Sequence, residues 1–438
     1  MAMRVFPDRG PWRIPAFRRV WTAAAVSAIG SRITRTALPV IAVSTLAVGP
    51  RAAALLGALS YGPGALVGLV AGGWVDRRRK RTLLVVADVA RAVLVMSLPV
   101  AHYLGALHLA HLYVVAALVG AATALFYLTE LSYLPELVSA DTLVDANGVT
   151  HATESIAEIT GPAVAGALIQ GIGAPLAVVL DALSYLWSAT FLRGLPDAPP
   201  AASDARTSLL GDLRAGFAAL WHDPLVRRLA LAELGTMIAS GTFVGLYVLY
   251  VLDVLALSEA TMGVIIGFGG VGALLGAVIV PRLARVHTAV WLAPLMLVSE
   301  ASALLIPAAR GSAAIAIACL IAHQLVGDGA RTAYGVLAIS LRQRRLPPAT
   351  MGRANAALQA SGTALMIVAA LATGELAARL GVRTTLWIGL ATGGLAVLPL
   401  LRLPRPDAPD APDAASAADA APQADAVTRT APAAAPRD

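Results

Sequence analysis

Residues 52–75 read AAALLGALSYGPGALVGLVAGGWV, and no charged side chain interrupts these 24 positions between Arg51 and Asp76. An α-helix of this length extends about 36 Å, whereas the hydrocarbon core of a bilayer is about 30 Å thick. Further charge-free runs occupy residues 159–180, 260–281, 354–374 and 384–401. Such runs predict transmembrane helices, so the sequence indicates an all-α integral membrane protein.

The composition of the whole chain leads to the same fold class. Of its 438 residues, 58% are hydrophobic and 13% are charged, whereas soluble domains carry about 25% charged residues. This hydrophobicity also excludes a disordered chain. The single cysteine, Cys319, excludes an internal disulfide and a cysteine-rich metal site.

Common catalytic and nucleotide-binding signatures are missing. The only lysine, Lys80, lies between arginines and does not follow a glycine-rich loop, so the chain has no P-loop for ATP. The hydrolase patterns GxSxG and HExxH are also absent. We therefore expect a protein that is not an enzyme and has no cofactor and no metal site. The arginines that give the chain its net charge of +7 cluster at the ends of apolar runs, as in membrane proteins, and this pattern argues against a nucleic-acid partner.

The arginines predict how the chain crosses the membrane. With the N-terminus inside, 21 Arg and Lys residues fall on the inner side and 4 on the outer side, before the C-terminal tail. This positive-inside pattern predicts cytoplasmic termini and a multi-pass protein of the cell inner (plasma) membrane. The twelve predicted spans are residues 20–46, 52–75, 82–104, 109–132, 146–170, 174–194, 229–252, 258–281, 288–309, 312–338, 352–378 and 382–402.

Composition also suggests how the chain is divided. The connection between the sixth and seventh spans contains Leu209 to Trp221, where apolar residues recur at helical spacing. This segment is either an amphipathic helix at the membrane interface or an ordinary linker helix. The predicted parts are a cytoplasmic segment (1–16), a six-helix half (17–195), the cytoplasmic linker (196–228), a second six-helix half (229–403) and a disordered Ala/Pro/Asp-rich tail (404–438).

The two halves resemble each other in sequence. Thr142, Ala146 and Asn147 recur 208 positions later as Thr350, Ala354 and Asn355, and each block leads into a long apolar run. The glycine-rich second and eighth spans also correspond. Two six-span repeats are an architecture of membrane transporters.

The connection between the second and third spans reads GGWVDRRRKR at residues 72–81. It resembles the signature loop of the major facilitator superfamily, G-x-x-x-D-R-x-G-R-R, although Arg79 replaces the usual inner glycine. The positions concerned are Gly72, Gly73, Asp76, Arg77, Lys80 and Arg81. By this resemblance the loop acts as a gate latch. The alternative is a purely topological role, in which positive charge keeps the loop inside. Asp88 and Arg91, at i and i+3, are expected to form a pair that supports the latch.

A second resemblance lies in the fifth span. Gly161, Pro162 and Gly166 resemble part of the antiporter motif of the same superfamily and are expected to form a helix-packing motif. The chain is similar to the drug:proton antiporter branch that holds bacterial macrolide and enterobactin exporters. That similarity rests on Leu134-Pro135-Glu136-Leu137-Val138, Asp181-Ala182-Leu183-Ser184-Tyr185 and Gly352-Arg353-x-Asn355.

The resemblance implies a fold and a function. The fold is twelve transmembrane helices in two six-helix pseudo-symmetric halves. The function is secondary active transport, expected here as proton-coupled export of drug-like or natural-product small molecules by rocker-switch alternating access. The partners would be a small-molecule substrate, protons and lipid, and the protein is expected to be a monomer. Two alternatives stay open: an importer or facilitator of a small polar or anionic solute, and a non-transporting membrane receptor or scaffold.

Charged residues inside predicted spans are costly and usually mark function. Arg32 and Arg35 lie about 18 and 22 Å into the first span, and Glu154 and Glu158 about 12 and 18 Å into the fifth, at 1.5 Å per residue. We expect these four to form an ion-pair cluster, used either for coupling or only as a brace between helices. By the resemblance, Glu233 and an Asp328–Arg331 pair also face the cavity, whereas Asp181 and Glu300 are structural.

Overall fold

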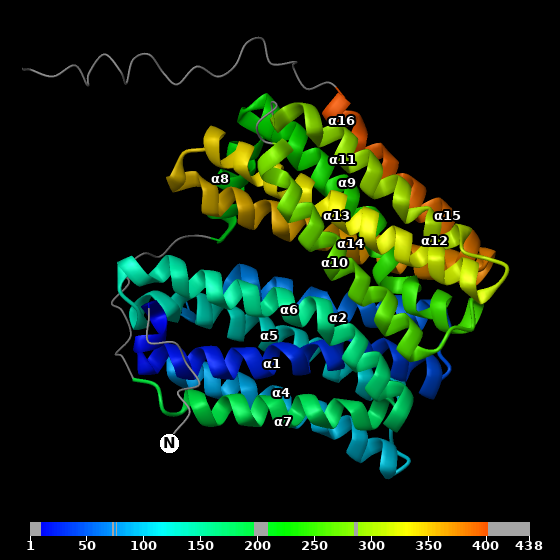
Figure 1. The fold of residues 1–438 in the computed structure, drawn as a ribbon, viewed down its shortest axis with the longest axis horizontal. Coiled ribbons are helices and arrows are strands. Elements are labelled where there is room, and N and C mark those ends of the chain that lie inside the picture. Colours follow the sequence, from blue (N-terminus) through cyan, green and yellow to red (C-terminus); the bar gives the residue numbers. More distant parts are fainter. Residues whose placement is uncertain (1–9, 72–73, 76, 197–208, 284–287, 402–438) are drawn as a thin grey trace, which may run out of the picture. The chain divides into compact units, whose positions relative to one another are not determined.

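The computed structural model describes residues 10–71, 74–75, 77–196, 209–283 and 288–401, and every regular element in those ranges is helical (Figure 1). The first half contains η1 (Gly10–Arg13), α1 (Pro15–Val40), η2 (Ile41–Thr45), α2 (Pro50–Val70), α4 (Lys80–Tyr103), α5 (Leu109–Leu137), α6 (Ala140–Ile172) and α7 (Ala174–Leu192). The connecting helix is α8 (Leu209–His222). The second half contains α9 (Pro224–Leu249), η3 (Tyr250–Val254), α10 (Glu259–Leu283), α11 (Thr288–Ala303), α12 (Leu305–Ala308), α13 (Ala313–Arg345), α14 (Pro348–Leu380), α15 (Val382–Ala391), η4 (Thr392–Val397) and α16 (Leu398–Leu401).

Eleven helical segments among the described residues are long and apolar enough to cross a membrane. The first predicted span, α1 with its extension η2, is a continuous helix of comparable length. Arg32 and Arg35 in the middle of α1 lower its hydropathy, because each places a charge among apolar residues. The all-helical, multi-pass fold expected from the sequence is therefore the fold observed.

Both halves share the same local backbone features. The first and seventh spans each end in a π-helical turn, Ile41–Thr45 and Tyr250–Val254. Two residues after each turn, an alanine adopts a left-handed conformation, with φ of +48° at Ala47 and +50° at Ala256. These positions are 209 residues apart, so the sequence repeat is also a repeat of backbone geometry.

The fifth and eleventh spans correspond even more closely. Helices α6 and α14 are both 33 residues long, and each is followed by a glycine with positive φ, Gly173 and Gly381. Near their starts, the Thr142 hydroxyl donates to the Ser139 carbonyl, and the Thr350 hydroxyl donates to the Pro347 carbonyl. The two six-helix halves are thus pseudo-symmetric.

Helix packing joins the halves through a few elements. Within the first half, α1 packs against α6 and α7, and α4 packs against α5 and α7. Contacts between the halves involve α6 with α10 and α2 with α9 and α14. At the α6–α10 crossing, Gly166 lies against Gly263, and the Pro162 carbonyl also faces Gly263. Small residues allow this close approach of two backbones.

Helix α8 is docked on the second half. Leu220 is fully buried in a cluster with Val226 of α9 and Ala357 of α14. Asp212 forms an ion pair with Arg353 of α14 at 3.3 Å. Phe217 and Trp221 remain partly exposed on the other side of α8. The predicted linker segment is therefore a helix that packs on protein along one face and leaves aromatic side chains on another.

Candidate functional site

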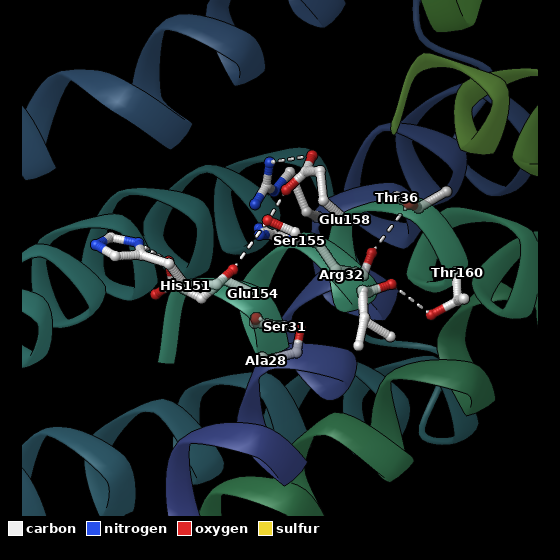
Figure 2. A network of polar contacts seen from close by, with 11 residues as sticks. Ala28, Ser31, Arg32, Thr36, His151, Glu154, Ser155, Glu158 and Thr160 are labelled. Carbon is white, nitrogen blue, oxygen red and sulfur yellow. Dashed lines mark hydrogen bonds and ion pairs between the residues drawn. The ribbon is translucent and has the colours of Figure 1, made fainter. Parts of the chain in front are cut away.

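The structure brings three of the charged residues predicted in the membrane together (Figure 2). Glu158 of α6 pairs with Arg32 of α1 at 2.5 Å and with Arg35 at 3.6 Å. The Arg32 side chain is 16% exposed, whereas Glu158 and Arg35 are about half exposed. The Glu158 carboxylate therefore pairs with two guanidinium groups, and the exposed parts of Glu158 and Arg35 remain accessible.

Local packing explains how Arg32 reaches Glu158. Gly161 of α6 lies directly against the stem of Arg32, and a Cβ there would stand 2.6 Å from Arg32 Cβ. Only glycine leaves room for α1 at this point. Thr36 donates a hydrogen bond to the Arg32 carbonyl, within the same helix. The Arg32 Nε atom is buried and has no hydrogen-bond partner among the described residues.

Glu154 does not join this group, which corrects the predicted four-residue cluster. Its carboxylate lies 3.5 Å from His151 Nδ1, one turn earlier in α6 (Figure 2). Glu154 and Glu158 share a face of α6 as their spacing requires. Only the position of Glu158 lies within reach of both arginines, because Glu154 is one further turn away from them along α6.

The predicted Asp328–Arg331 pair is also corrected. Arg331 of α13 instead donates to Glu300 of α11 at 2.9 Å, and the Glu300 side chain is almost fully buried. Asp328 lies on another side of α13, next to Gly269 of α10 and close to Gln324. A spacing of three residues allows a local pair, but the neighbouring helix offers Arg331 a carboxylate in a better position.

Glu233 forms an ion pair across two helices. Its carboxylate accepts from Arg342 of α13 at 3.2 Å, and the Arg342 side chain is 8% exposed. The pair connects the beginning of α9 with the end of α13. The sequence predicts Glu233 at the cavity but does not indicate Arg342, because a basic residue at the end of a span is indistinguishable from a topological charge.

The described part of the signature loop makes contacts within the first half. Gly72, Gly73 and Asp76 lie outside the described residues. Lys80 forms an ion pair with Glu136 of α5 and donates to the Ser132 carbonyl at 3.0 Å. Arg81 donates to the Leu195 carbonyl at 3.3 Å, and Arg77 is exposed.

Asp88 and Arg91 form a buried ion pair in α4. The Arg91 guanidinium lies between the rings of Phe126 and Tyr185, 4.3 Å from each centroid. Cation–π contacts on both faces and a carboxylate at the edge therefore hold the guanidinium in place.

One ion-pair group that the sequence did not indicate links the two halves. Glu375 of α14 accepts two hydrogen bonds from Arg51 at the start of α2, at 2.5 and 3.0 Å. It also accepts from Arg379, one turn later in α14, at 2.8 Å. In the sequence, Arg51 and Arg379 are two of the four basic residues on the predicted outer side. A pairing between Arg51 and Glu375, so far apart in the chain, carries no local signal.

Comparison with known proteins identifies the family. The profile of a family described as transmembrane secretion effectors matches residues 8–430. An uncharacterized MFS-type transporter of Sinorhizobium fredii (strain NBRC 101917 / NGR234) is 26% identical over 353 residues, which are 78% of this chain and 83% of that protein.

Solved structures share the fold. A bacterial homologue of the iron transporter ferroportin in the inward-facing state has a TM-score of 0.69 at 19% identity, covering 90% of this chain and 99% of its own. The nucleoside transporter NupG has a TM-score of 0.70 at 13% identity, covering 88% and 98%. At these identities the likeness concerns the fold alone, and the cargoes of those transporters do not carry over.

Proposed function

Since this chain belongs to the major facilitator superfamily, in the family of transmembrane secretion effectors, it is a multi-pass membrane transporter with a small-molecule cargo, and we propose that it exports that cargo in exchange for protons. The cargo class we propose is amphipathic, drug-like or natural-product molecules. The protein would act as a monomer in the cell inner membrane with both termini in the cytoplasm, as the arginine distribution favours.

The Arg32–Glu158–Arg35 group carries this proposal. It lies midway along α1 and α6, and Glu158 and Arg35 are each about half exposed. Charged side chains at the middle of a membrane span are strongly disfavoured in contact with lipid. The exposed sides of this group therefore favour a water-accessible path through the protein.

Protonation of Glu158 would couple this group to transport. As a carboxylate, Glu158 neutralises one of two nearby guanidinium groups. A hydrogen-bond-donating group of the cargo can bind this carboxylate, and it loses that partner when Glu158 takes up a proton. Proton and cargo would thus compete for Glu158, which is the requirement for exchange.

Alternating access would use the contacts between the halves. The ion pair of Lys80 with Glu136 and the hydrogen bond of Arg81 to the Leu195 carbonyl hold the start of α4 to α5 and to the segment that follows α7 in the first half. We propose that the signature loop, supported in this way, is a latch on the cytoplasmic side. The halves would rock about the α2–α14 and α6–α10 crossings.

The experiment is proton flux in everted membrane vesicles with an acidic interior. A panel of anionic and neutral amphipathic compounds is added outside to wild type and to Glu158→Gln. Cargo-triggered loss of the gradient in wild type, absent in Glu158→Gln, would support proton exchange through Glu158. Asp253→Asn is the matched control, because Asp253 is an exposed carboxylate at the end of the seventh span.

Import or facilitated diffusion of a polar or anionic solute is the second candidate, because two arginines against one carboxylate would also bind such a solute. Uptake of labelled compound down its own gradient, unchanged when the proton gradient is dissipated, would favour it. A gradient loss of equal size in wild type and Glu158→Gln would remove Glu158 from the coupling path.

A further inference from the structure

A second buried charge cluster lies in the first half, away from the Arg32–Glu158 pair. Asp88 and Arg91 of α4 are 0% and 3% exposed, and the guanidinium is enclosed by Phe126 and Tyr185. The mechanism proposed above does not use either residue. Their burial raises the question of which charges balance one another there.

A second carboxyl group faces the same region from α7. Asp181 is completely buried, and the Ser184 hydroxyl lies within hydrogen-bond distance of its backbone carbonyl, at 2.8 Å, and of its Oδ1 atom, at 3.2 Å. On the opposite side, α1 passes so close that a Cβ on Gly30 would stand 2.6 Å from Asp181 Oδ1. The positive charge of Arg91 attracts the carboxyl group of Asp181 and also that of Glu130 of α5.

Several polar atoms of this cluster lie beside one another without hydrogen bonds of good geometry, such as Ser188 Oγ beside Asp88 and Thr34 Oγ1 beside Asp181. Five buried atoms have no hydrogen-bond partner of good geometry among the described residues: Asp88 Oδ2, Asp181 Oδ2, Ser188 Oγ, Thr34 Oγ1 and Arg91 Nε. Native interiors rarely leave so many polar atoms of one region unsatisfied, and such atoms commonly mark bound protons or water.

The charges of the cluster do not balance if every carboxyl group is ionised. Arg91 supplies one positive charge, and Asp88, its direct partner, neutralises it. Asp181 would then be a second negative charge in a site closed to water, which is far less favourable than a neutral carboxylic acid. Glu130 of α5 is a further carboxyl group near Arg91, so Arg91 has more carboxyl groups around it than its single positive charge can balance.

We propose that Asp181 binds a proton, so that the Asp88–Arg91–Asp181 cluster is a second protonation site of the transporter. The inference rests on the proposed function in one respect, namely that proton binding serves transport. The two sites lie against different faces of α1. Arg32 faces Glu158 of α6, and Gly30 faces Asp181 of α7. A shift of α1 when Arg32 leaves Glu158 would therefore also change the surroundings of Asp181.

The test compares the same chemical change at the two carboxyl groups. Asparagine resembles a protonated aspartic acid in shape and charge, so Asp181→Asn should leave the thermal midpoint of the purified full chain within about 2 °C of wild type. Asp88→Asn leaves Arg91 buried without its counter-charge, and its midpoint should fall by about 5 °C or more. Equal losses in both variants, or failure of Asp181→Asn to fold, would overturn the proposal.

Titration provides a second measurement. Above about pH 4 the unfolded chain loses the Asp181 proton while the folded protein keeps it, so the wild-type midpoint should fall as the pH rises from about 4 and level off once the folded protein also releases the proton. The fall should be smaller in Asp181→Asn and should persist in Glu158→Gln. A wild-type midpoint that does not change with pH, or a fall abolished only by Glu158→Gln, contradicts a proton on Asp181.

Infrared spectroscopy separates this inference from the proposed function. The carbonyl stretch of a protonated carboxylic acid should be present in wild type without cargo and weaker in Asp181→Asn. This readout needs no transport. If the band is lost while vesicles show no proton flux, the protonation site stands and proton-coupled transport fails. If flux is observed while the band is unchanged, the reverse holds.

Discussion

Arg32 and Arg35 differ in their surroundings although both contact Glu158. The Arg32 stem is packed under Gly161 and its head is mostly covered, whereas Arg35 is half exposed and stands 3.6 Å from the carboxylate. Arg32 thus contributes to helix packing as well as charge, and Arg35 contributes mainly charge on the accessible side. Substitutions at the two positions should separate stability from transport.

We expect Arg35→Ala to abolish transport while the protein still inserts and keeps a near wild-type thermal midpoint, because the side chain is half exposed. Arg32→Ala should lose transport and also about 1–3 kcal/mol of stability, since it leaves Glu158 with its weaker partner. Vesicle transport and thermal melting in detergent measure the two effects. Transport retained by Arg35→Ala would remove this arginine from the mechanism.

Ala47 and Ala256 adopt a backbone conformation that favours glycine, with φ near +50°. A left-handed conformation costs a residue with a Cβ about 1–2 kcal/mol. Glycine avoids this cost, but its greater conformational freedom in the unfolded chain offsets part of the gain in stability. Ala47→Gly and Ala256→Gly should each stabilise the protein by about 0.5–1 kcal/mol. Ala372→Gly, at an exposed position inside α14, should instead destabilise by about 1 kcal/mol. Equal midpoints in all three variants would contradict the backbone argument.

The positions of the charged residues could be predicted from the sequence, but most of their partners could not. Depth along the helix was enough to bring Arg32 to Glu158, because both distances follow from 1.5 Å per residue. The partners of Glu154, Asp328 and Arg331 depend on how each helix is rotated about its axis and on what its neighbour presents. That rotation is decided by packing, which a single sequence does not reveal.

At the scale of elements, the length of an apolar run predicts a membrane span, but it does not determine where the helix begins and ends. Helices α6 and α13 extend beyond the predicted 146–170 and 312–338 because hydrogen bonding and loop contacts continue outside the hydrocarbon region. The π-helical turns that end the first and seventh spans carry no composition signal. The repeat was visible in a few matched residues, and the structure shows it in whole helices of equal length.

Helix α8 depends on one glycine for its docking on α14. A Cβ on Gly216 would approach the Arg353 carbonyl more closely than two atoms can, so Gly216→Val should lift α8 from α14. Overpacking of this kind costs about 1–3 kcal/mol. Limited proteolysis with trypsin at the exposed Arg214 should become faster. Ala218→Val, on an exposed position of the same helix, is the control, and equal cleavage of both variants would contradict the docking.

At the scale of the whole molecule, the close contacts between halves involve the helix ends opposite the signature loop. Val244 of α9 lies against Gly57 of α2, and Ala54 lies against Gly374 of α14. Arg51 and Glu375 join the same two halves at that end through two hydrogen bonds. This ion pair therefore favours the arrangement in which the halves are closed on the side opposite the signature loop.

The two arginines on Glu375 offer a matched test of that closure. Arg51→Gln and Arg379→Gln each remove one partner of the same carboxylate, but only Arg51 belongs to the other half. In a Cys319→Ser background, Val244→Cys reports access to the contact between halves. In intact cells, Arg51→Gln should raise the labelling of the cysteine at position 244 by a membrane-impermeant maleimide several-fold. The substitution removes an ion pair that only the closed arrangement makes, so the open arrangement becomes more populated. Arg379→Gln should leave labelling unchanged, since its pair lies within α14. Equal labelling in both variants would mean that the ion pair does not hold the halves together and that packing alone closes them.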